Sequence, residues 1–221
     1  MLGASLLADP APKPARAIAH GPRDQPRVAL TFDACSGRPP WKLDEGVVEA
    51  LEKTKTKATF FVGGRWAEQD PERVKRLLAN PSFEIESHAY DHPHLTGLGS
   101  AAIRSEISKA NDVLTPLLGH PPHYLRAPYG ESNARVVRVA QSLGLTVIKF
   151  DLASGDPDRK FSRRRLTRWV LREIRPGSIV VFHVNGRGWH TAEALPGIVA
   201  GLEKKGLEPV TLSELLSHDG D

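Results

Sequence analysis

Two histidines, His88 and His92, stand four residues apart just after an apolar run. Their imidazole nitrogens are common ligands of divalent metal ions, and a spacing of four can bring both rings to one face of a helical turn. Both histidines can equally be structural, held by hydrogen bonds within a loop. The pair therefore indicates a metal site only if other reactive side chains accompany it.

Other reactive residues stand at the ends of apolar, strand-like runs. Asp33 ends the run that begins at Val28, and His183 ends the run that begins at Ile179. Between them in the chain lies the segment 125–130, Leu-Arg-Ala-Pro-Tyr-Gly. Barrel enzymes build their active sites from side chains at the ends of several strands, and this arrangement favours such an enzyme.

Strand-like and helix-like segments alternate from Arg27 onward. The expected strands are Val28–Phe32, Ala58–Val62, Phe83–Glu86, Thr146–Phe150, Ile179–Phe182 and a segment around Pro209–Leu212. The expected helices are Asp44–Lys53, Pro71–Ala79, Ala101–Leu118, Asn133–Leu143, Arg163–Ile174 and Ala192–Lys205. Such alternation is typical of a parallel sheet with helical crossovers, and about six or seven units fit a small, incomplete barrel. We predict a single α/β domain over residues 27–221, after a flexible leader or export-signal remnant over residues 1–26.

The composition is that of an ordinary globular protein, with 40% hydrophobic and 25% charged residues and a net charge of +4. A single cysteine, Cys35, excludes an internal disulfide framework. No apolar stretch approaches the roughly 20 residues that cross a bilayer. The basic run 159–165 favours a solvated helix face, with contact to an anionic polymer as the alternative. No nucleic-acid or protein partner is implied, and the apolar start of the chain favours export, with the cytoplasm as the alternative.

Five motifs together resemble those of the polysaccharide deacetylases of carbohydrate esterase family 4, the NodB-homology domain. In chain order they are Thr31-Phe32-Asp33, Ala58–Val62, His88-x-x-x-His92-Pro93, Arg126–Gly130 and Ile179–His183. The resemblance covers about residues 27–216. It implies a distorted (β/α)7-type barrel and metal-assisted hydrolysis that removes N-acetyl or O-acetyl groups from a glycan such as peptidoglycan or a chitin-like oligomer.

The resemblance also implies a role for the acidic, basic and histidine positions. His88 and His92 would hold a divalent cation, for which zinc is favoured. Asp33 would be the base that takes a proton from the metal-bound water, and Arg126 would be its ionic partner. Without the family pattern, Asp33 is equally well explained as a turn residue and Arg126 as a surface arginine.

The remaining motifs would complete the site. The backbone N–H of Tyr129, in the turn that begins at Pro128, would bind the oxyanion formed at the acetyl carbon. His183 would be the general acid, oriented and charged by Asp156, and Val181 would line the acetyl pocket. The alternatives are a simple tight turn at Pro128 and a core histidine at position 183.

The chain departs from the family pattern directly after Asp33. The family carries a second acid there that binds the metal, whereas this chain has Ala34. Loss of one anionic ligand weakens cation binding unless something replaces it. The candidate replacements are Asp33 itself, a thiolate from Cys35, or a water, and a buried, inert thiol is the alternative for Cys35.

A second departure concerns the walls of the site. Pro157 stands where the family usually has a tryptophan that contacts the sugar, and Trp189 or Trp41 are candidate substitutes, although either can be plain packing. His94 and His190 are further candidates for metal ligands or substrate contacts, but the interpretation disfavours such a role for either histidine.

Three functions agree with these residues. The first is hydrolytic deacetylation of a glycan. The second, prompted by Ala34, is a degenerate deacetylase domain that binds glycan without turnover. The third is a hydrolase of the same fold that acts on a non-sugar amide, because barrel enzymes change substrate through their loops.

Overall fold

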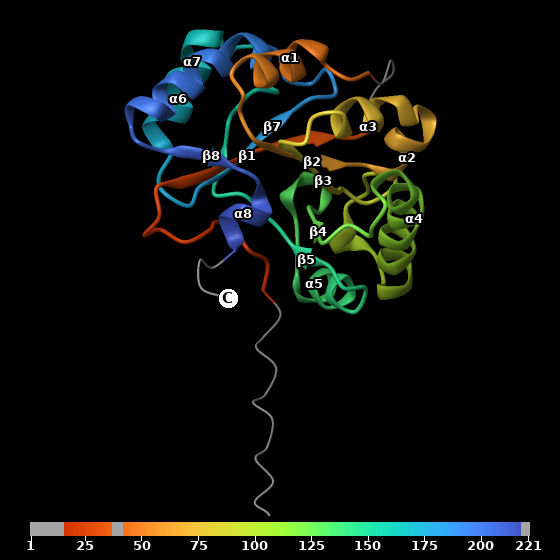
Figure 1. The fold of residues 1–221 in the computed structure, drawn as a ribbon. Coiled ribbons are helices and arrows are strands. Elements are labelled where there is room, and N and C mark those ends of the chain that lie inside the picture. Colours follow the sequence, from red (N-terminus) through yellow and green to blue (C-terminus); the bar gives the residue numbers. More distant parts are fainter. Residues whose placement is uncertain (1–15, 37–41, 218–221) are drawn as a thin grey trace, which may run out of the picture.

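The computed structural model describes residues 16–36 and 42–217, which form one eight-stranded sheet. The strands are β1 (Arg27–Ala34), β2 (Ala58–Val62), β3 (Phe83–Ser87), β4 (Tyr124–Leu125), β5 (Thr146–Val147), β6 (Leu152–Ala153), β7 (Ile179–His183) and β8 (Glu208–Val210). The eight strands pair with one another in parallel, in the order β5-β4-β3-β2-β1-β7-β6, with β8 paired to β1. The sheet curls into a half-barrel, which confirms the predicted distorted α/β barrel (Figure 1).

Helices join the strands and pack around the sheet. They are α1 (Glu45–Lys53), α2 (Gly64–Gln69), α3 (Pro71–Leu78), α4 (Ser100–Leu118), α5 (Ala134–Gln141), α6 (Arg163–Glu173), α7 (Thr191–Lys204) and α8 (Leu212–Leu216), with 3₁₀ turns at Leu95–Gly97 and Pro128–Gly130. Figure 1 shows α1, α6 and α7 gathered on one side and α2, α3 and α4 on the other. Within the described ranges, none of these helices is long and apolar enough to span a membrane.

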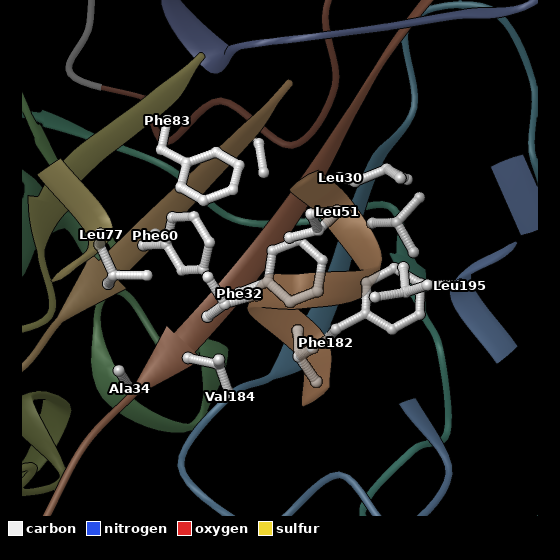
Figure 2. Packing of buried hydrophobic residues seen from close by; sticks show 14 of the residues in the cluster. Leu30, Phe32, Ala34, Leu51, Phe60, Leu77, Phe83, Phe182, Val184 and Leu195 are labelled. Carbon is white, nitrogen blue, oxygen red and sulfur yellow. The ribbon is translucent and has the colours of Figure 1, made fainter. Parts of the chain in front are cut away.

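The outer face of β1 packs into the main apolar core. Leu30, Phe32 and Ala34 are fully buried in the cluster between the sheet and its helices. The ring of Phe32 stacks between those of Phe60 and Phe182, at centroid distances of 5.3 and 5.4 Å, as Figure 2 shows. Complete burial of such a ring stabilises the fold by about 1.5–3 kcal/mol, so this layer fixes the position of β1 in the sheet.

The inner face of β1 is polar toward its carboxyl end. Because successive strand residues point to opposite faces, Thr31 and Asp33 project away from the apolar layer and into the half-barrel. There both accept hydrogen bonds from the buried Arg126. The same strand therefore holds the core on one side and reactive groups on the other.

The expected elements are present with shifted ends, and the elements not expected are all short. Strands β4 and β6 have two residues each, too few for a period to be read, and α2 and α8 have six and five. The expected strand Thr146–Phe150 is regular only over Thr146–Val147. Beyond it the chain pairs with the predicted leader, since the N–H of Lys149 donates to the carbonyl of Ile18 at 2.7 Å. The described part of the leader thus packs on the sheet, and the boundary at residue 26 remains a prediction.

A buried glutamate in β3 makes stability depend on pH. Burial raises the pKa of Glu86 to about 8, against an ordinary value of 4.5, although its Oε2 accepts backbone N–H groups of His123 and Tyr124 at 2.8 Å. Between these two pH values the folded state keeps a proton that the unfolded state has lost, so stability falls as pH rises. We expect Glu86→Gln to flatten this dependence, by up to about 4 kcal/mol over the window. Urea unfolding at pH 5 and pH 8 measures the change in unfolding free energy between the two pH values, with the exposed Glu49→Gln as control. If Glu86→Gln and Glu49→Gln both showed the same change as the wild type, the assignment to Glu86 would be contradicted.

Candidate active site

Five of the predicted site residues lie at one edge of the sheet, where the parallel strands end. Asp33 is the last residue but one of β1, His88 follows β3, Arg126 follows β4, and His183 is the last residue of β7. Asp156 lies shortly beyond β6. Barrel folds place their active sites at the carboxyl ends of the strands, and the topology alone gathers these side chains there.

Asp33 is held by a buried arginine. It lies beside His183 in the register of β1 and β7, and Arg126 Nη1 donates to its Oδ1 at 2.9 Å. The guanidinium is also fixed by the hydroxyl of Thr31 at 2.8 Å and lies 4.0 Å from the ring centroid of Phe61. Burial alone would raise the pKa of Asp33, but Arg126 and the nearby imidazoles outweigh it and hold that pKa below its ordinary value. The carboxylate is therefore ionised at neutral pH and aimed by the arginine.

The rings of His88 and His92 lie edge to face, with centroids 5.0 Å apart. The helical turn suggested by their spacing was wrong, because residues 88–92 form a loop. Within it Ala89 and His92 both take a φ of 59°, in the left-handed region. Such backbone costs about 1–3 kcal/mol per residue and clusters at functional sites. The loop, rather than helical periodicity, brings the two rings together.

Hydrogen bonding and burial prepare both rings as metal ligands. Nδ1 of His88 lies 2.8 Å from the carbonyl oxygen of Arg126, which only accepts, so Nδ1 carries the proton. Nε2 keeps its lone pair and lies 3.8 Å from Asp33 Oδ2. Burial lowers the pKa of His88, and burial together with His88 lowers the pKa of His92 to about 3. Both imidazoles are therefore neutral at physiological pH, the form that binds a metal.

A third donor lies beside the two rings. One ligand atom each from Cys35, His88 and His92 lie within 4.8 Å of one another. The thiol is buried, and this burial together with the charge of Asp33 raises its pKa to about 11. Nitrogen and sulfur are preferred donors of zinc, and a thiol that coordinates a metal loses its proton. The residues present thus fit a zinc ion, even though position 34 has no ligand.

His183 is oriented by a buried carboxylate. Its Nδ1 lies 2.9 Å from Asp156 Oδ1, so the ring donates its Nδ1 proton there and leaves Nε2 for other contacts. The other oxygen, Oδ2, accepts from the backbone N–H of His183 at 2.8 Å and from the hydroxyl of Thr191 at 2.7 Å. A fourth bond comes from the hydroxyl of Ser154 at 3.0 Å. Both oxygens of the carboxylate are fully engaged, which fixes the histidine ring in one orientation.

The turn Pro128–Gly130 approaches the same site. Tyr129 has φ 61° and ψ 5°, and Gly130 has φ 70°. A Cβ at Gly130 would lie 2.9 Å from the ring of Phe150, so only glycine fits this close approach. Pro128 is buried, whereas the Tyr129 side chain is half exposed and stacks on His94 with centroids 3.8 Å apart.

Some of these residues line a cleft of about 240 Å³. It is lined by Asp33, His92, Tyr129, Gly130, Phe150, Ala153, Ser154, Gly155, Asp156, Pro157, Val181, His183 and Arg187. Val181 lies in this wall, as does Pro157 at the position of the missing tryptophan. Phe150 supplies an aromatic surface in the lining, so the cleft keeps an aromatic side chain contributed by another segment.

Trp189, His94 and His190 are not part of this lining. Trp189 is exposed, and the guanidinium of Arg159 sits 3.9 Å from its ring centroid. Trp41 lies outside the described residues. His94 and His190 face glutamates instead, at 3.1 and 3.2 Å.

Asn185, Arg187 and Phe150 are among the residues of the site that were not foreseen. Asn185 and Arg187 come from the glycine-rich segment that directly follows His183. Asn185 donates to the carbonyl of Cys35 at 2.8 Å and to its sulfur at 3.3 Å, and Arg187 lines the cleft. Phe150 had been assigned to a strand. The signal available for Asn185 and Arg187 was their position directly after a motif histidine.

The comparisons place the chain in a family. Residues 20–148 match the family model for polysaccharide deacetylases, more than half of the chain. The fold and the strand-end histidines and carboxylates are those of a barrel hydrolase, and the chain belongs to the polysaccharide deacetylase family, carbohydrate esterase family 4. The predicted family is thereby confirmed.

Three relatives show how the similarity is distributed. A peptidoglycan-N-acetylglucosamine deacetylase of Bacillus cereus is 32% identical over 198 residues, 88% of this chain and 70% of that protein. The Listeria monocytogenes peptidoglycan-N-acetylglucosamine deacetylase PgdA is 33% identical over 86% of this chain, which spans only 38% of that protein. A solved pseudoenzyme of the same family from Bacillus anthracis is 27% identical, with a TM-score of 0.82, over 92% of this chain and 69% of that one. A mutant of that pseudoenzyme has restored enzymatic activity.

Proposed function

We propose that this protein is a metal-dependent deacetylase that hydrolyses the N-acetyl group of a glycan built from N-acetylglucosamine, such as peptidoglycan or a chitin-like oligomer. The observation that carries the proposal is the ion-paired Asp33 beside both His88 Nε2 and His183. An ionised carboxylate next to a pair of neutral imidazoles and a carboxylate-held histidine suits metal-assisted hydrolysis of an amide, with a base, two metal ligands and an acid. The names of the Bacillus cereus and Listeria relatives support the substrate class.

In this proposal His88 and His92 hold the metal, with zinc favoured by their nitrogen donors. When bound, zinc polarises the acetyl carbonyl and lowers the pKa of a nearby water. Nε2 of His88 is available because the carbonyl of Arg126 holds the proton on Nδ1. The hydrogen bond from Nδ1 to the Arg126 carbonyl orients the ring and makes Nε2 a stronger metal ligand.

Asp33 and His183 share the proton transfers. Asp33 takes a proton from the attacking water while Arg126 keeps it ionised and in place. The water oxygen bonds to the carbonyl carbon, and in this proposal the backbone N–H of Tyr129 donates a hydrogen bond to the developing oxyanion. His183, carrying a proton on both ring nitrogens and held by Asp156, then donates its Nε2 proton to the amine nitrogen as the C–N bond breaks, and Asp33 afterwards releases the proton that it took from the water. The products are acetate and the free amino sugar.

The cleft wall sets the specificity in this proposal. Val181 and Phe150 bring apolar surface to the lining beside His183, which suits a methyl group. Export to the cell envelope or beyond follows from a cell-wall substrate and is part of the proposal.

Chelation tests the proposal. We expect the protein to release acetate from a chitooligosaccharide or from peptidoglycan, and to lose at least about tenfold in rate after a chelator removes its metal. Adding Zn²⁺ or Co²⁺ should restore the rate, whereas Mg²⁺ should not, because imidazole favours the later transition metals. Acetate release at full rate from protein shown by elemental analysis to be metal-free would contradict metal dependence.

A second candidate function is glycan binding without turnover. It is favoured by Ala34, which removes the acid at the position of the family's metal ligand, and by the similarity to a pseudoenzyme of the same family. It predicts saturable binding of the oligosaccharide with no acetate released at any metal concentration. That result would replace the deacetylase proposal.

A further inference from the structure

At the end of β1 the side chains of Ala34 and Cys35 lie in different surroundings. Strand pairing continues through Ala34, which is opposite Val62 in the register with β2. The methyl group of Ala34 is therefore buried in the apolar cluster, where Figure 2 shows it beside the end of the strand. Cys35 lies directly after the strand, and its sulfur lies among the ligand atoms of His88 and His92. On this backbone a carboxylate at position 34 would enter the core, whereas a side chain at position 35 meets the site.

The sulfur of Cys35 closes a three-donor cluster. Its Sγ and one nitrogen each from His88 and His92 lie within 4.8 Å of one another, although they come from two separate segments of the chain. The thiol is 2% exposed and His88 is equally buried. Two imidazoles and one sulfur around one point are a donor set that zinc uses in proteins.

The polar groups around the Cys35 sulfur are hydrogen-bond donors, for which the sulfur is the acceptor. Asn185 Nδ2 lies 3.3 Å from Sγ and is held in place by the backbone carbonyl of Cys35 at 2.8 Å. The side chain of Arg187 also hydrogen-bonds to the thiol. Both groups only donate through these nitrogens, and N–H donors around a sulfur stabilise a metal-bound thiolate by holding its negative charge.

We infer that Cys35 is the third protein ligand of the metal, giving a two-histidine, one-cysteine centre in place of one completed by an acid at position 34. This inference rests on the proposed metal site of His88 and His92. A thiolate restores the single negative charge that Ala34 removes, and leaves a fourth position open for chemistry. Because sulfur is a soft donor, the centre should select Zn²⁺ or Co²⁺ over Mg²⁺ and Ca²⁺.

Cobalt substitution tests the ligand directly, independently of activity. Cys35 is the only cysteine in the sequence, so a thiolate-to-cobalt charge-transfer band in the near ultraviolet identifies it without ambiguity. We expect the band to appear on titration of the metal-free protein with Co²⁺ and to vanish on addition of Zn²⁺. Zinc, and not Mg²⁺, should also protect the thiol from a thiol-specific reagent.

Matched variants separate the ligand from the site as a whole. Cys35→Ala should remove the band and weaken zinc binding at least about a hundredfold, as expected for loss of a direct ligand. Cys35→Asp should retain tighter binding than Cys35→Ala without the band. His88→Ala should abolish binding, whereas His120→Ala, an exposed histidine elsewhere, should leave it unchanged.

The outcomes distinguish failure of the inference from failure of the proposed function. Tight cobalt binding that requires His88 but shows no thiolate band, with Cys35→Ala unimpaired, would overturn the role of Cys35 and leave the histidine site standing. No binding by the wild-type protein would overturn both. Because the band and the thiol protection are measured on the wild-type chain, the test holds even where a variant fails to fold.

Discussion

Asp33→Asn is expected to lower the rate of acetate release at least about a hundredfold while the fold is retained. Asparagine keeps the shape of the side chain but lacks the negative charge that takes a proton from water. The loss should fall mainly on kcat, because the carboxylate is needed for the chemical step more than for glycan binding. Steady-state kinetics on a chitooligosaccharide, with circular dichroism to verify the fold, measure the effect.

The control for this prediction is Asp151→Asn. Asp151 is another aspartate that pairs with an arginine, Arg23 at 2.7 Å, but this pair is more exposed to solvent and lies outside the cleft lining. It should keep the wild-type rate. If Asp33→Asn turned over at a rate close to wild type, another group would have to be the base.

Arg126→Met should cost about 3–5 kcal/mol of stability at neutral pH, the second large effect. Arg126 is fully buried and is the charge partner of Asp33, so its removal leaves a carboxylate without a cation in the interior of the half-barrel. The pKa of Asp33 is lowered in the folded state, so its ionised form contributes stability above its ordinary pKa, and this contribution is lost as pH falls. The deficit of the variant should therefore shrink under acidic conditions. Urea unfolding across pH measures both parts.

Two further variants isolate the pair. The double variant Asp33→Asn with Arg126→Met should be more stable than Arg126→Met alone, because neither charge is then left unpaired. Arg23→Met, which breaks the partly exposed pair with Asp151, should cost less than about 1 kcal/mol. Equal losses for Arg23→Met and Arg126→Met would show that burial of the Asp33 pair has no special weight.

The scaffold was predictable because β1, β2 and β7 are largely apolar runs, and the helices between the strands have clear boundaries. Asp70 before Pro71 and Asn133 before α5 are examples: both side chains accept N–H groups at the helix starts. The two-residue strands β4 and β6 were not predicted, because two residues are too few to show the alternation that identifies a strand. They nevertheless position Arg126 and Asp156, so the most functional edge of the sheet is also the least regular.

Residue types in the site were predictable, but their geometry was not. The spacing of His88 and His92 suggested a helical turn, whereas a loop with left-handed residues at positions 89 and 92 brings the rings together. Backbone of that kind leaves no signature in a single sequence unless glycine occupies it. The side to which Cys35 points was not predictable, because this residue lies just beyond the end of β1, where strand alternation no longer fixes the direction of a side chain.

Anomalous diffraction at the zinc edge, on crystals grown with stoichiometric Zn²⁺, tests the central claim most directly. We expect one strong peak about 2.0–2.1 Å from Nε2 of His88 and from a ring nitrogen of His92, beside the carboxylate of Asp33. An ion bound elsewhere on the molecule, with these two rings free of it, would contradict the account.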